Sequence, residues 1–475
     1  MVADVSTTYV GSALTEAQAR YAELNSRSRE ANEAARQSLP GGNTRTPLYA
    51  TPFPLTFKSG AGATLTSLDG DTYLDFLGDY SAGIFGHRDD RLVKAITDAL
   101  QNGWNLGGHN MYEKELAAKV TSRFGPSGLE LVRFTNSGTE ANTLNCATAL
   151  TFTGRKKILT FSAAFHGSTF MFPIDLMRKT TEIPTNLPHE FVIAPFNNIP
   201  ATKAILDDLP KDSLAAIIVE PIQGSGGCRP ASVEFLHFLR NIADQQRALL
   251  IVDEVMASRL SPNGYCASIG LRADLLSLGK YVGGGMTFGA FGGRREIMEL
   301  YDPSKSRLQH GGTFNNNVVT MAAGIEGLKI YNASKVDRLN ASGVGLKKTL
   351  QQILIDEGVY RHHPDGASRN LIEVDFMTGP SKVLPDDTSL PPSENLPRMF
   401  VSGLGSMLNV RFSGSQALLW QALFYHHMVQ RHIYLAQRGY LPLNLELKDA
   451  DLARFVECFK EFVLKHKQEL LSSGS

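Results

Sequence analysis

A single lysine, Lys280, ends an apolar run in the stretch DLLSLGKYVGGGMTFGAFGG, which covers residues 274–293. A buried lysine is costly unless its charge is paired or chemically removed. The glycines that follow leave room for another backbone or a ligand to come close. Because surface lysines outnumber buried ones, the local sequence alone favours an ordinary lysine at the end of a strand. A functional role for Lys280 therefore depends on what the rest of the chain places beside it.

Two hydroxyl residues flank a glycine directly after the apolar run LVRFT. Asn136 is followed by Ser137, Gly138 and Thr139, and a helical pattern begins there. Free backbone N–H groups, the positive end of a helix dipole and two hydroxyls suit a bound phosphate. A plain helix N-cap at Ser137 or Thr139 explains the same residues and, taken alone, is the simpler explanation.

Aromatic and acidic side chains follow other apolar runs. Phe165 and His166 lie in LTFSAAFHG, where a ring could stack on a planar ligand, although Phe165 alone is explained more simply as a core residue. Asp253 and Glu254 end the run LLIVDE, and Glu220 ends IIVE. A carboxylate at such a place could bind a metal, act as a general base, pair with a cation or keep a ring nitrogen protonated. Position alone does not decide between these roles.

Together these features form a specific set: an anion site, an aromatic platform, an acid after a strand and a lysine 27 residues after that acid. Pyridoxal phosphate (PLP) needs all four, for its phosphate, its ring face, its pyridine nitrogen and its aldehyde. A Schiff base would also remove much of the cost of burying Lys280. The glycine run fits neither common nucleotide-binding pattern, so a nucleotide site is a weak alternative. The sequence therefore predicts a PLP site that includes Lys280 and Asp253.

The middle of the chain must supply the elements that bring these residues together. Short runs rich in Ile, Val and Leu alternate with helical patterns such as SVEFLHFLRNIADQQR. Strands buried on both faces and separated by helices predict an α/β fold with a mostly parallel sheet over roughly residues 60–330. In such a sheet, ligands bind beyond the carboxyl ends of the strands. The expected strands include KKILTF, EFVIAP, LAAIIVEP and ALLIVDEV.

The remaining residues predict a smaller α+β domain, with elements at KKTLQQILIDEG, SMLNVRF and DLARFVECFKEFVLKHK. We expect an N-terminal segment, 1–60, that joins the small domain, a large PLP-binding domain, 61–332, and a C-terminal small domain, 333–475. A Pro- and Ser-rich stretch near 361–398 has the composition of a surface loop or insertion.

Composition excludes several other classes of function. Basic and acidic residues both count 47, so the net charge is zero, which argues against a nucleic-acid or membrane-surface partner. No apolar run approaches the roughly 20 residues that span a bilayer, and the N-terminus lacks the pattern of a secretory signal. The four cysteines are scattered without a C-x-x-C pair, and no H-E-x-x-H occurs. These patterns predict reduced thiols, a cytoplasmic location and no metal site.

The motifs NSGTEAN, AFHG, VEPIQG, VDEVM, LGKYVGGGM and HGGTFNNN occur in the order found in class III PLP enzymes of fold type I, and the chain resembles that family. The resemblance covers about residues 38–465. The family includes ω-aminotransferases and glutamate-1-semialdehyde aminomutases. The stretches LPGGNTR, FPLTF, FLGDYSAGIFGH, GGHNMYE and FGAFGGR are most similar to aminotransferases that act on aromatic β-amino acids such as β-phenylalanine.

The resemblance implies a role for each matching residue. Lys280 forms the Schiff base and then moves protons at the substrate carbon, while Asp253 pairs with the pyridinium. Arg45 receives the carboxylate of a β-amino acid, and Arg438 takes the α-carboxylate of the other substrate, because a guanidinium binds carboxylates bidentately. Without the resemblance, a surface ion pair explains either arginine. The other implied cofactor contacts are Ser137, Gly138 and Thr139 at the phosphate, Phe165 and Val255 on the two ring faces, His166, Glu220, Met256, and Thr313 at the phosphate of a second subunit in a homodimer.

The resemblance thus implies an aminotransferase that works by a ping-pong cycle. It would move an amino group from a β-amino acid to an α-oxo acid such as 2-oxoglutarate or pyruvate. A glutamate-1-semialdehyde type aminomutase and an amino acid racemase share the same cofactor residues and stay open as alternatives. A non-enzymatic binding protein is disfavoured because Lys280 and Asp253 are both intact. Two departures stand out: Phe165 replaces the tyrosine common in close relatives, and the insertion near 361–398 is longer than the family pattern.

Overall fold

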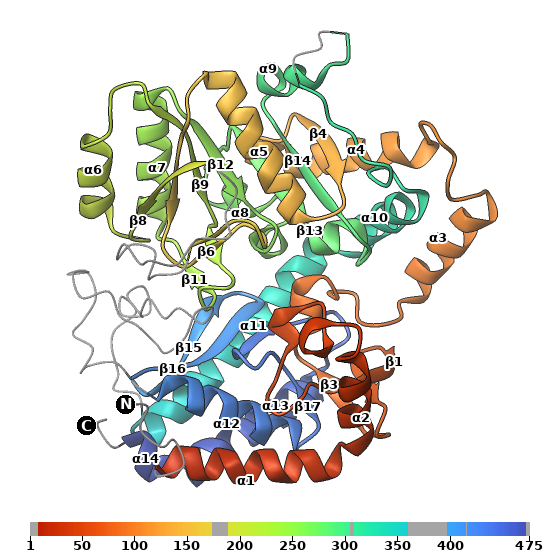
Figure 1. Cartoon of the computed structure of the whole chain (residues 1–475), viewed down its shortest axis with the longest axis vertical. Helices are drawn as coiled ribbons and strands as arrows, with labels where there is room; N and C mark the ends of the chain where they lie inside the picture. The colour runs from red at the N-terminus through yellow and green to blue at the C-terminus, as the bar shows by residue number, and fades with distance from the viewer. Residues whose placement is uncertain (1–7, 173–188, 305–307, 360–396, 415, 472–475) are drawn as a thin grey trace.

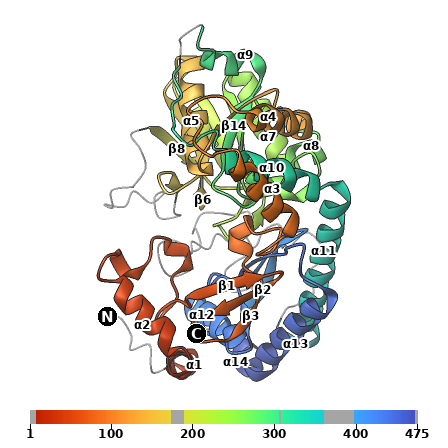
Figure 2. The same cartoon turned by 90° about the vertical axis from the view of Figure 1, so that its right-hand side faces the viewer.

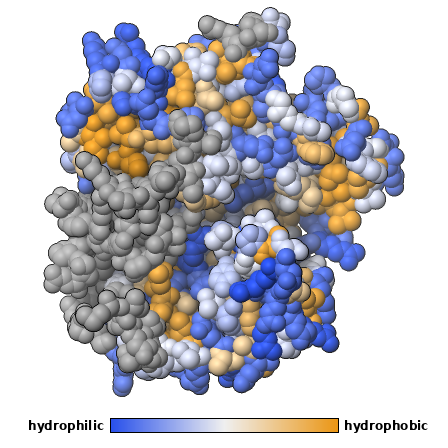
Figure 3. Space-filling view, viewed as in Figure 1, coloured by the Kyte–Doolittle hydropathy of each residue, from blue (hydrophilic) through white to orange (hydrophobic). Residues whose placement is uncertain are grey.

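The computed structural model describes residues 8–172, 189–304, 308–359, 397–414 and 416–471. These residues form two lobes, one above the other in Figure 1. The large lobe is built on a seven-stranded sheet, and the small lobe is built on sheets of four and three strands. On the face seen in Figure 3, the surface is hollowed between the two lobes.

The seven-stranded sheet confirms the predicted α/β fold. All of its strands run parallel except β14, which pairs antiparallel with β4 and β13. The four strands expected from apolar runs are present as β5, β8, β9 and β12. In spatial order, the strands are β4 (Leu131–Thr135), β14 (Gly289–Gly293), β13 (Leu275–Gly279), β12 (Leu249–Asp253), β9 (Leu214–Val219), β5 (Lys157–Phe161) and β8 (Glu190–Ala194).

The central strands are buried on both faces, as their unbroken apolar composition predicts. Alternate residues of β12 enter different clusters: Leu250 packs with α7 residues such as Phe235, whereas Ile251 packs with α5 residues such as Ala149. Helices therefore cover both faces of the sheet, as Figure 1 shows. The helices of the large lobe are α3 (Asp90–Gln101), α4 (Met111–Phe124), α5 (Gly138–Thr153), α6 (Ile199–Asp207), α7 (Val233–Gln246), α8 (Tyr265–Ser268), α9 (Arg295–Met298) and α10 (Val318–Ile330).

The small lobe joins the two ends of the chain. Strand β3 (Thr72–Asp75) pairs in parallel with β17 (Ile433–Tyr434), which follows it by more than 300 residues. The long helix α11 (Ala333–Asp356) leads down from the large lobe and packs against β15 and α13, as seen in Figure 2. The other elements are α1 (Tyr9–Leu24), α2 (Ser26–Ala35), β1 (Phe57–Ala61), β2 (Thr64–Ser67), β15 (Met399–Leu404), β16 (Met407–Phe412), α12 (Ala417–Val429), β18 (Tyr440–Pro442), α13 (Asp449–Lys465) and α14 (Lys467–Leu471).

Three short ladders complete the description of the strands. They are β6 (Ala164–Phe165) with β7 (Met171–Phe172), and β10 (Ile222–Gln223) with β11 (Arg229–Pro230), together with the β16–β18 pairing. The domain boundaries at residues 60 and 332 stay predictions. The predicted insertion near 361–398 lies outside the described residues except for its last two positions.

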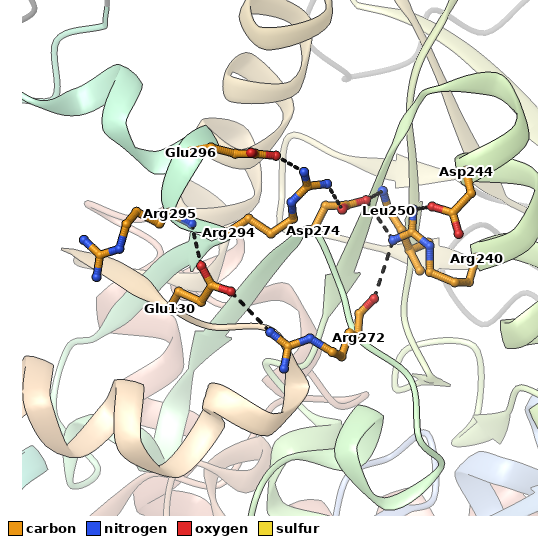
Figure 4. A network of polar contacts seen from close by, with 9 residues as sticks. All are labelled: Glu130, Arg240, Asp244, Leu250, Arg272, Asp274, Arg294, Arg295 and Glu296. Atoms are coloured by element: carbon orange, nitrogen blue, oxygen red, sulfur yellow. Dashed lines mark hydrogen bonds and ion pairs between the residues drawn. The ribbon is translucent and has the colours of Figure 1, made fainter.

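An ion-pair network closes the amino-terminal edge of the sheet (Figure 4). Asp274, directly before β13, is buried, and its carboxylate accepts hydrogen bonds from Arg240 Nη1 and Arg294 Nη1, each at 2.8 Å. The backbone N–H of Leu250 donates to the same carboxylate, also at 2.8 Å. Glu296 pairs with Arg294 at the exposed rim. These contacts tie β12, β13 and α7 together at the edge away from the predicted cofactor site.

Among the described residues, no helix combines the length and the apolar character needed to cross a bilayer.

Candidate active site

The predicted functional residues gather at the carboxyl edge of the seven-stranded sheet. Asp253 is the last residue of β12, Lys280 directly follows β13, and Glu220 directly follows β9. Because β9, β12 and β13 are parallel and in register, these three positions lie at the same edge. Ser137 follows β4 at that edge and caps α5.

Asp253 is a buried carboxylate held by three donors. Its Oδ2 accepts hydrogen bonds from His166 Nδ1 at 2.9 Å and Asn142 Nδ2 at 2.7 Å, and its Oδ1 accepts from the backbone N–H of Val255 at 3.0 Å. Asn142 was not predicted as a site residue, although it ends the NSGTEAN motif. Since a carboxylate has about four acceptor positions, this network orients Asp253 and leaves capacity for one more donor.

The neighbouring acid, Glu254, has a structural role. It is fully buried, and its two oxygens accept hydrogen bonds from the backbone N–H groups of Tyr265 and Cys266, each at 2.8 Å. Glu254 therefore holds the start of α8, and only Asp253 faces the His166 network. Within the described residues, no group of three or more His, Cys, Asp or Glu side chains is arranged to hold a metal ion.

Lys280 has an unusual backbone and an unusual acidity. Its φ of +54° lies in the left-handed region, which a side chain normally avoids and which recurs at functional sites. Burial lowers the pKa of the Lys280 ammonium to about 8, while the nearby charges of Asp79, Asp253 and Glu220 oppose that shift and Arg45 adds to it. A neutral, nucleophilic amine is therefore accessible near neutral pH.

The glycines after Lys280 serve the protein's own packing. Gly284 has a φ of +66°, and a Cβ atom placed on it would lie 2.3 Å from the carbonyl oxygen of Ala323 in α10. At Gly283, a Cβ would lie 2.2 Å from Cβ of Phe288. Close approach to the α10 backbone at Gly284 and to the Phe288 side chain at Gly283 thus requires these glycines, whatever ligand the site binds.

Both explanations of Ser137 and Thr139 are compatible with the structure. Ser137 caps α5 through its Oγ, which accepts from the backbone N–H of Glu140 at 3.2 Å. The turn from Ser137 to Thr139 is nevertheless only half-buried, so its backbone N–H groups stay open to an anion at the helix N-terminus. A Cβ on Gly138 would lie 2.8 Å from Val255 Cγ2, so the glycine brings Val255 and the start of α5 together.

Glu220 organises the segment that carries Phe165. Its Oε2 accepts from the backbone N–H of Phe165 at 2.9 Å, and its Oε1 accepts from the backbone N–H of Gly224 at 3.1 Å. Burial raises the pKa of Glu220 to about 7; the charge of Asp253 adds to the rise and His166 opposes it. Phe165 itself is half-buried, so it is not a fully enclosed core residue.

The two predicted substrate arginines contact neighbouring residues of one turn. Arg45 Nη1 pairs with Asp79 Oδ1 at 2.6 Å, and the guanidinium of Arg438 lies 5.8 Å from the ring centroid of Tyr80. The Tyr80 hydroxyl donates to the carbonyl oxygen of Pro47 at 2.5 Å, which ties the same turn to the Arg45 loop. Asp79 and Tyr80 lie in the motif FLGDYSAGIFGH, but neither was predicted as a site residue.

The last two predicted residues lie at the margin of this arrangement. Met256 packs against Gly224, where a Cβ would lie 3.1 Å from its Cε. Thr313 is exposed. Its segment lies beside the phosphate turn of the same chain, because Asn136 Nδ2 donates to Asn315 Oδ1 at 3.0 Å. These contacts leave the Thr313 hydroxyl in solvent in the single chain.

The residues fit PLP. The carboxyl edge offers a half-open helix N-terminus for a phosphate, an acceptor at Asp253 for a protonated ring nitrogen and a lysine of lowered pKa for an aldehyde. The Nε2 atom of His166 is buried and has no hydrogen-bond partner among the described residues, which is typical of a polar group beside a ligand site.

Comparison with known proteins agrees with this chemistry. The family model for class III aminotransferases matches residues 47–362. A β-phenylalanine transaminase from Variovorax paradoxus is 38% identical over 469 residues, which cover 96% of this chain and 97% of that protein. A glutamate-1-semialdehyde 2,1-aminomutase from Ignicoccus hospitalis is 36% identical over 338 residues, which cover 69% of this chain and 79% of that protein.

The fold agrees as well. The solved structure of a β-phenylalanine aminotransferase from Variovorax paradoxus superposes with a TM-score of 0.84 at 37% identity, and the match covers 97% of this chain and 98% of that chain. With the family match and the residues of the carboxyl edge together, the chain belongs to the class III aminotransferases, which are PLP-dependent enzymes of fold type I.

Proposed function

We propose that this enzyme moves an amino group from a β-amino acid to an α-oxo acid such as 2-oxoglutarate or pyruvate, in two half-reactions that use one site in turn. The observation that carries this proposal is the convergence of Arg45 and Arg438 on the consecutive residues Asp79 and Tyr80. Two guanidinium groups from distant segments give the site two separate anchors for carboxylates.

The proposed cofactor contacts follow the geometry of the carboxyl edge. When bound, PLP supplies the electron sink and the temporary store for the amino group. Ser137, Gly138 and Thr139 would hold its phosphate, and Asp253 would keep its ring nitrogen protonated. Lys280 would move a proton at the substrate carbon. The side chains proposed to line the ring and its surroundings are Phe165, Val255, His166, Glu220 and Met256.

Two anchors suit two substrates of different shape. In an α-oxo acid the carboxylate is attached directly to the reacting carbon, whereas in a β-amino acid it lies one carbon further away. We assign Arg45 to the carboxylate of the β-amino acid and Arg438 to that of the oxo acid. The relative that acts on β-phenylalanine supports this choice of donor.

The test separates the two half-reactions in rapid-mixing experiments. Arg45→Ala should slow the half-reaction with 3-amino-3-phenylpropanoate, and Arg438→Ala should mainly slow the half-reaction with 2-oxoglutarate or pyruvate. Losing a bidentate charged contact costs a few kcal/mol, so each affected half-reaction should slow about 10- to 1,000-fold. Each half is followed through the absorbance change of the cofactor.

Arg91→Ala is the matched control, because Arg91 forms a similarly short ion pair with Asp89 at 2.5 Å on the surface helix α3. Its two half-reactions should match those of the wild type. Equal losses in both halves for both site variants would refute the division of labour. The similarity to aminomutases makes aminomutase activity the alternative function. Conversion of glutamate-1-semialdehyde without any added oxo acid would favour that alternative.

We further propose that the enzyme is a homodimer in which Thr313 reaches the phosphate of the second subunit. An apolar patch beside Thr313 supports this: Trp104, Leu106, Met111 and Phe314 are each more than half exposed, and Trp104 and Phe314 line one hollow of about 440 Å³. Apolar colour also gathers over α3 at the right of Figure 3. Exposed patches of this kind mark interaction surfaces.

Sedimentation velocity tests the dimer. The wild type should sediment as a dimer or a multiple of it, and Phe314→Asp should shift it toward monomer and weaken PLP binding together. A fully active monomer at assay concentration would contradict the shared site. A cytoplasmic location stays part of the proposal.

A further inference from the structure

The turn that carries Asp79 is held in a rare backbone conformation. Gly78, Asp79, Tyr80 and Ser81 have φ values of +50°, +45°, +53° and +82°. Left-handed backbone at three consecutive non-glycine residues costs of the order of 1 kcal/mol or more per residue, so the surroundings must impose it.

Anchors on both sides of Asp79 impose this conformation. Ser81 Oγ accepts a hydrogen bond at 2.8 Å from Nη1 of Arg259, which is fully buried. On the other side, Tyr80 donates to the carbonyl oxygen of Pro47 at 2.5 Å, and its ring stacks at 5.8 Å on Tyr440. The rigid neighbours therefore fix the turn, whereas the Asp79 side chain itself is half-exposed.

The same turn lies against the segment that carries Lys280. A Cβ atom placed on Gly285 would lie 3.5 Å from the carbonyl oxygen of Ala82, the residue after the turn. Among nearby charges, Asp79 has the largest effect on the pKa of Lys280 and raises it, while Arg45 lowers that pKa. The charges of Asp79 and Arg45 therefore both act at the Lys280 side chain, which is where the substrate's amino group must arrive.

We propose that Arg45 and Asp79 form an exchangeable ion pair that selects zwitterions: the substrate's carboxylate takes Arg45, and its ammonium group takes the Asp79 carboxylate that Arg45 releases. This proposal rests on the assignment of Arg45 to the donor carboxylate. Arg45 and Asp79 are each half-exposed and joined by one nitrogen–oxygen contact of 2.6 Å, so separating the pair costs little free energy. An amino acid restores a partner to both charges.

A ligand with only one of the two charges cannot complete the exchange. A plain carboxylate would take Arg45 and leave Asp79 without a cation, and a plain amine would leave Arg45 without an anion. Both should bind poorly, so the pair discriminates against products and metabolites that lack one charge. Specificity here comes from the cost of a charge left unpaired.

The experiment compares 3-amino-3-phenylpropanoate with its deaminated analogue, 3-phenylpropanoate, on the PLP-loaded enzyme. The first ligand is followed by the concentration dependence of the single-turnover half-reaction, and the second by its competitive inhibition constant in the same assay. Asp79→Asn removes the negative charge with little change in shape. The measured ratio is the inhibition constant of 3-phenylpropanoate divided by the half-saturating concentration of the amino acid. In Asp79→Asn this ratio should fall about tenfold, because 3-phenylpropanoate binds more tightly and the amino acid does not.

Asp207→Asn is the matched control, since Asp207 forms an exposed 2.6 Å ion pair with Lys203 on α6. That variant should keep the wild-type ratio. In an Arg45→Ala background, Asp79→Asn should no longer tighten 3-phenylpropanoate. A ratio within twofold of the wild type in Asp79→Asn, or a tightening that persists without Arg45, would overturn the proposal.

The outcomes also separate this inference from the proposed function. Wild-type enzyme that fails to react with the β-amino acid, or Arg45→Ala enzyme that binds it normally, would refute the assigned donor site, and the exchange would fall with it. If Arg45→Ala slows the half-reaction with the β-amino acid as expected, but Asp79→Asn keeps the wild-type ratio, the exchange alone is refuted.

Discussion

His166 Nδ1 donates a 2.9 Å hydrogen bond to Asp253 Oδ2, and both side chains are buried. A carboxylate only accepts, so the imidazole proton must lie on Nδ1 in this pair. The contact joins the segment after β5 to the end of β12 and orients the carboxylate that we assign to the cofactor ring. The role of Asp253 can therefore be tested separately from its packing.

Asp253→Asn should lower turnover by several orders of magnitude. An asparagine can keep part of the hydrogen bonding but has no charge with which to hold a ring proton, so the electrostatic contribution to catalysis is lost. Some PLP should still bind through the phosphate turn at α5. Steady-state turnover and cofactor absorbance together measure the two effects.

Glu254→Gln is the neighbouring control. Glu254 accepts backbone hydrogen bonds from Tyr265 and Cys266 and a further one from the Cys266 thiol, all within the start of α8, so its variant should lose stability but keep the PLP spectrum and most of its turnover. Near-normal turnover in Asp253→Asn, or an equal loss in both variants, would remove Asp253 from the ring-nitrogen role.

Lys280 should be the residue that borohydride links to PLP. Because burial lowers the pKa of Lys280 to about 8, its neutral amine grows in population between about pH 7 and pH 9. PLP-free enzyme should thus recombine with PLP faster as pH rises, with an apparent pKa near this value. Lys280→Ala should give no borohydride-fixed cofactor, and covalent labelling of that variant, detected by mass spectrometry, would disprove the assignment.

Much of the site was predictable because it follows a repeated rule. Each buried strand of the sheet is an apolar run, and the residue after the run lies at the carboxyl edge, which correctly placed Asp253, Glu220 and Lys280 together. The sequence did not separate Asp253 from Glu254. Consecutive strand residues point to opposite sides, and only tertiary partners show which side holds the site.

Asn142 and Asp79 were missed for different physical reasons. Asn142 acts through Asp253, which is 111 positions away in the chain, so the NSGTEAN motif that contains Asn142 does not reveal this partner. Asp79 depends on a left-handed backbone that its residue type does not predict and that distant anchors such as Arg259 impose. The glycines after Lys280 stand out in the sequence, but only the fold shows that Gly284 packs against α10.

The buried network around Asp274 predicts a purely structural variant. Asp274→Ala would leave Arg240 without one of its two carboxylate partners. It would also remove the acceptor of the buried Leu250 N–H and one hydrogen bond of Arg294. Removing one partner of a buried ion pair costs about 3 to 5 kcal/mol. Urea unfolding should show a loss of this size, with a nearly unchanged PLP spectrum in the folded enzyme.

Glu296→Gln is the control within the same network. Glu296 pairs with Arg294 but is 59% exposed, so its loss should cost at most about 1 kcal/mol. Equal losses in the two variants would show that the burial of Asp274 does not set the strength of its contacts.

Three buried histidines of the small lobe predict how stability depends on pH. Burial lowers the pKa of His426 to about 4, of His427 to about 3 and of His466 to about 4, against about 6.5 in an unfolded chain. The folded state therefore favours the neutral form of each ring. Its stabilising contribution is complete above about pH 6.5 and is lost as pH falls toward 4, because the unfolded chain then binds more protons.

Urea unfolding at pH 7.5, 6.5, 5.5 and 4.5 measures this loss, which for the three rings together should reach about 4 kcal/mol at pH 5.5 and about 8 kcal/mol at pH 4.5. His427 donates through Nε2 to the carbonyl oxygen of Cys458 at 2.9 Å, and His427→Gln keeps a donor but cannot titrate. In that variant the slope of the unfolding free energy against pH should be smaller by the contribution of one of the three rings. His109→Gln should leave it unchanged, since His109 is 98% exposed. The same slope in His427→Gln as in the wild type would show that this ring does not couple folding to pH.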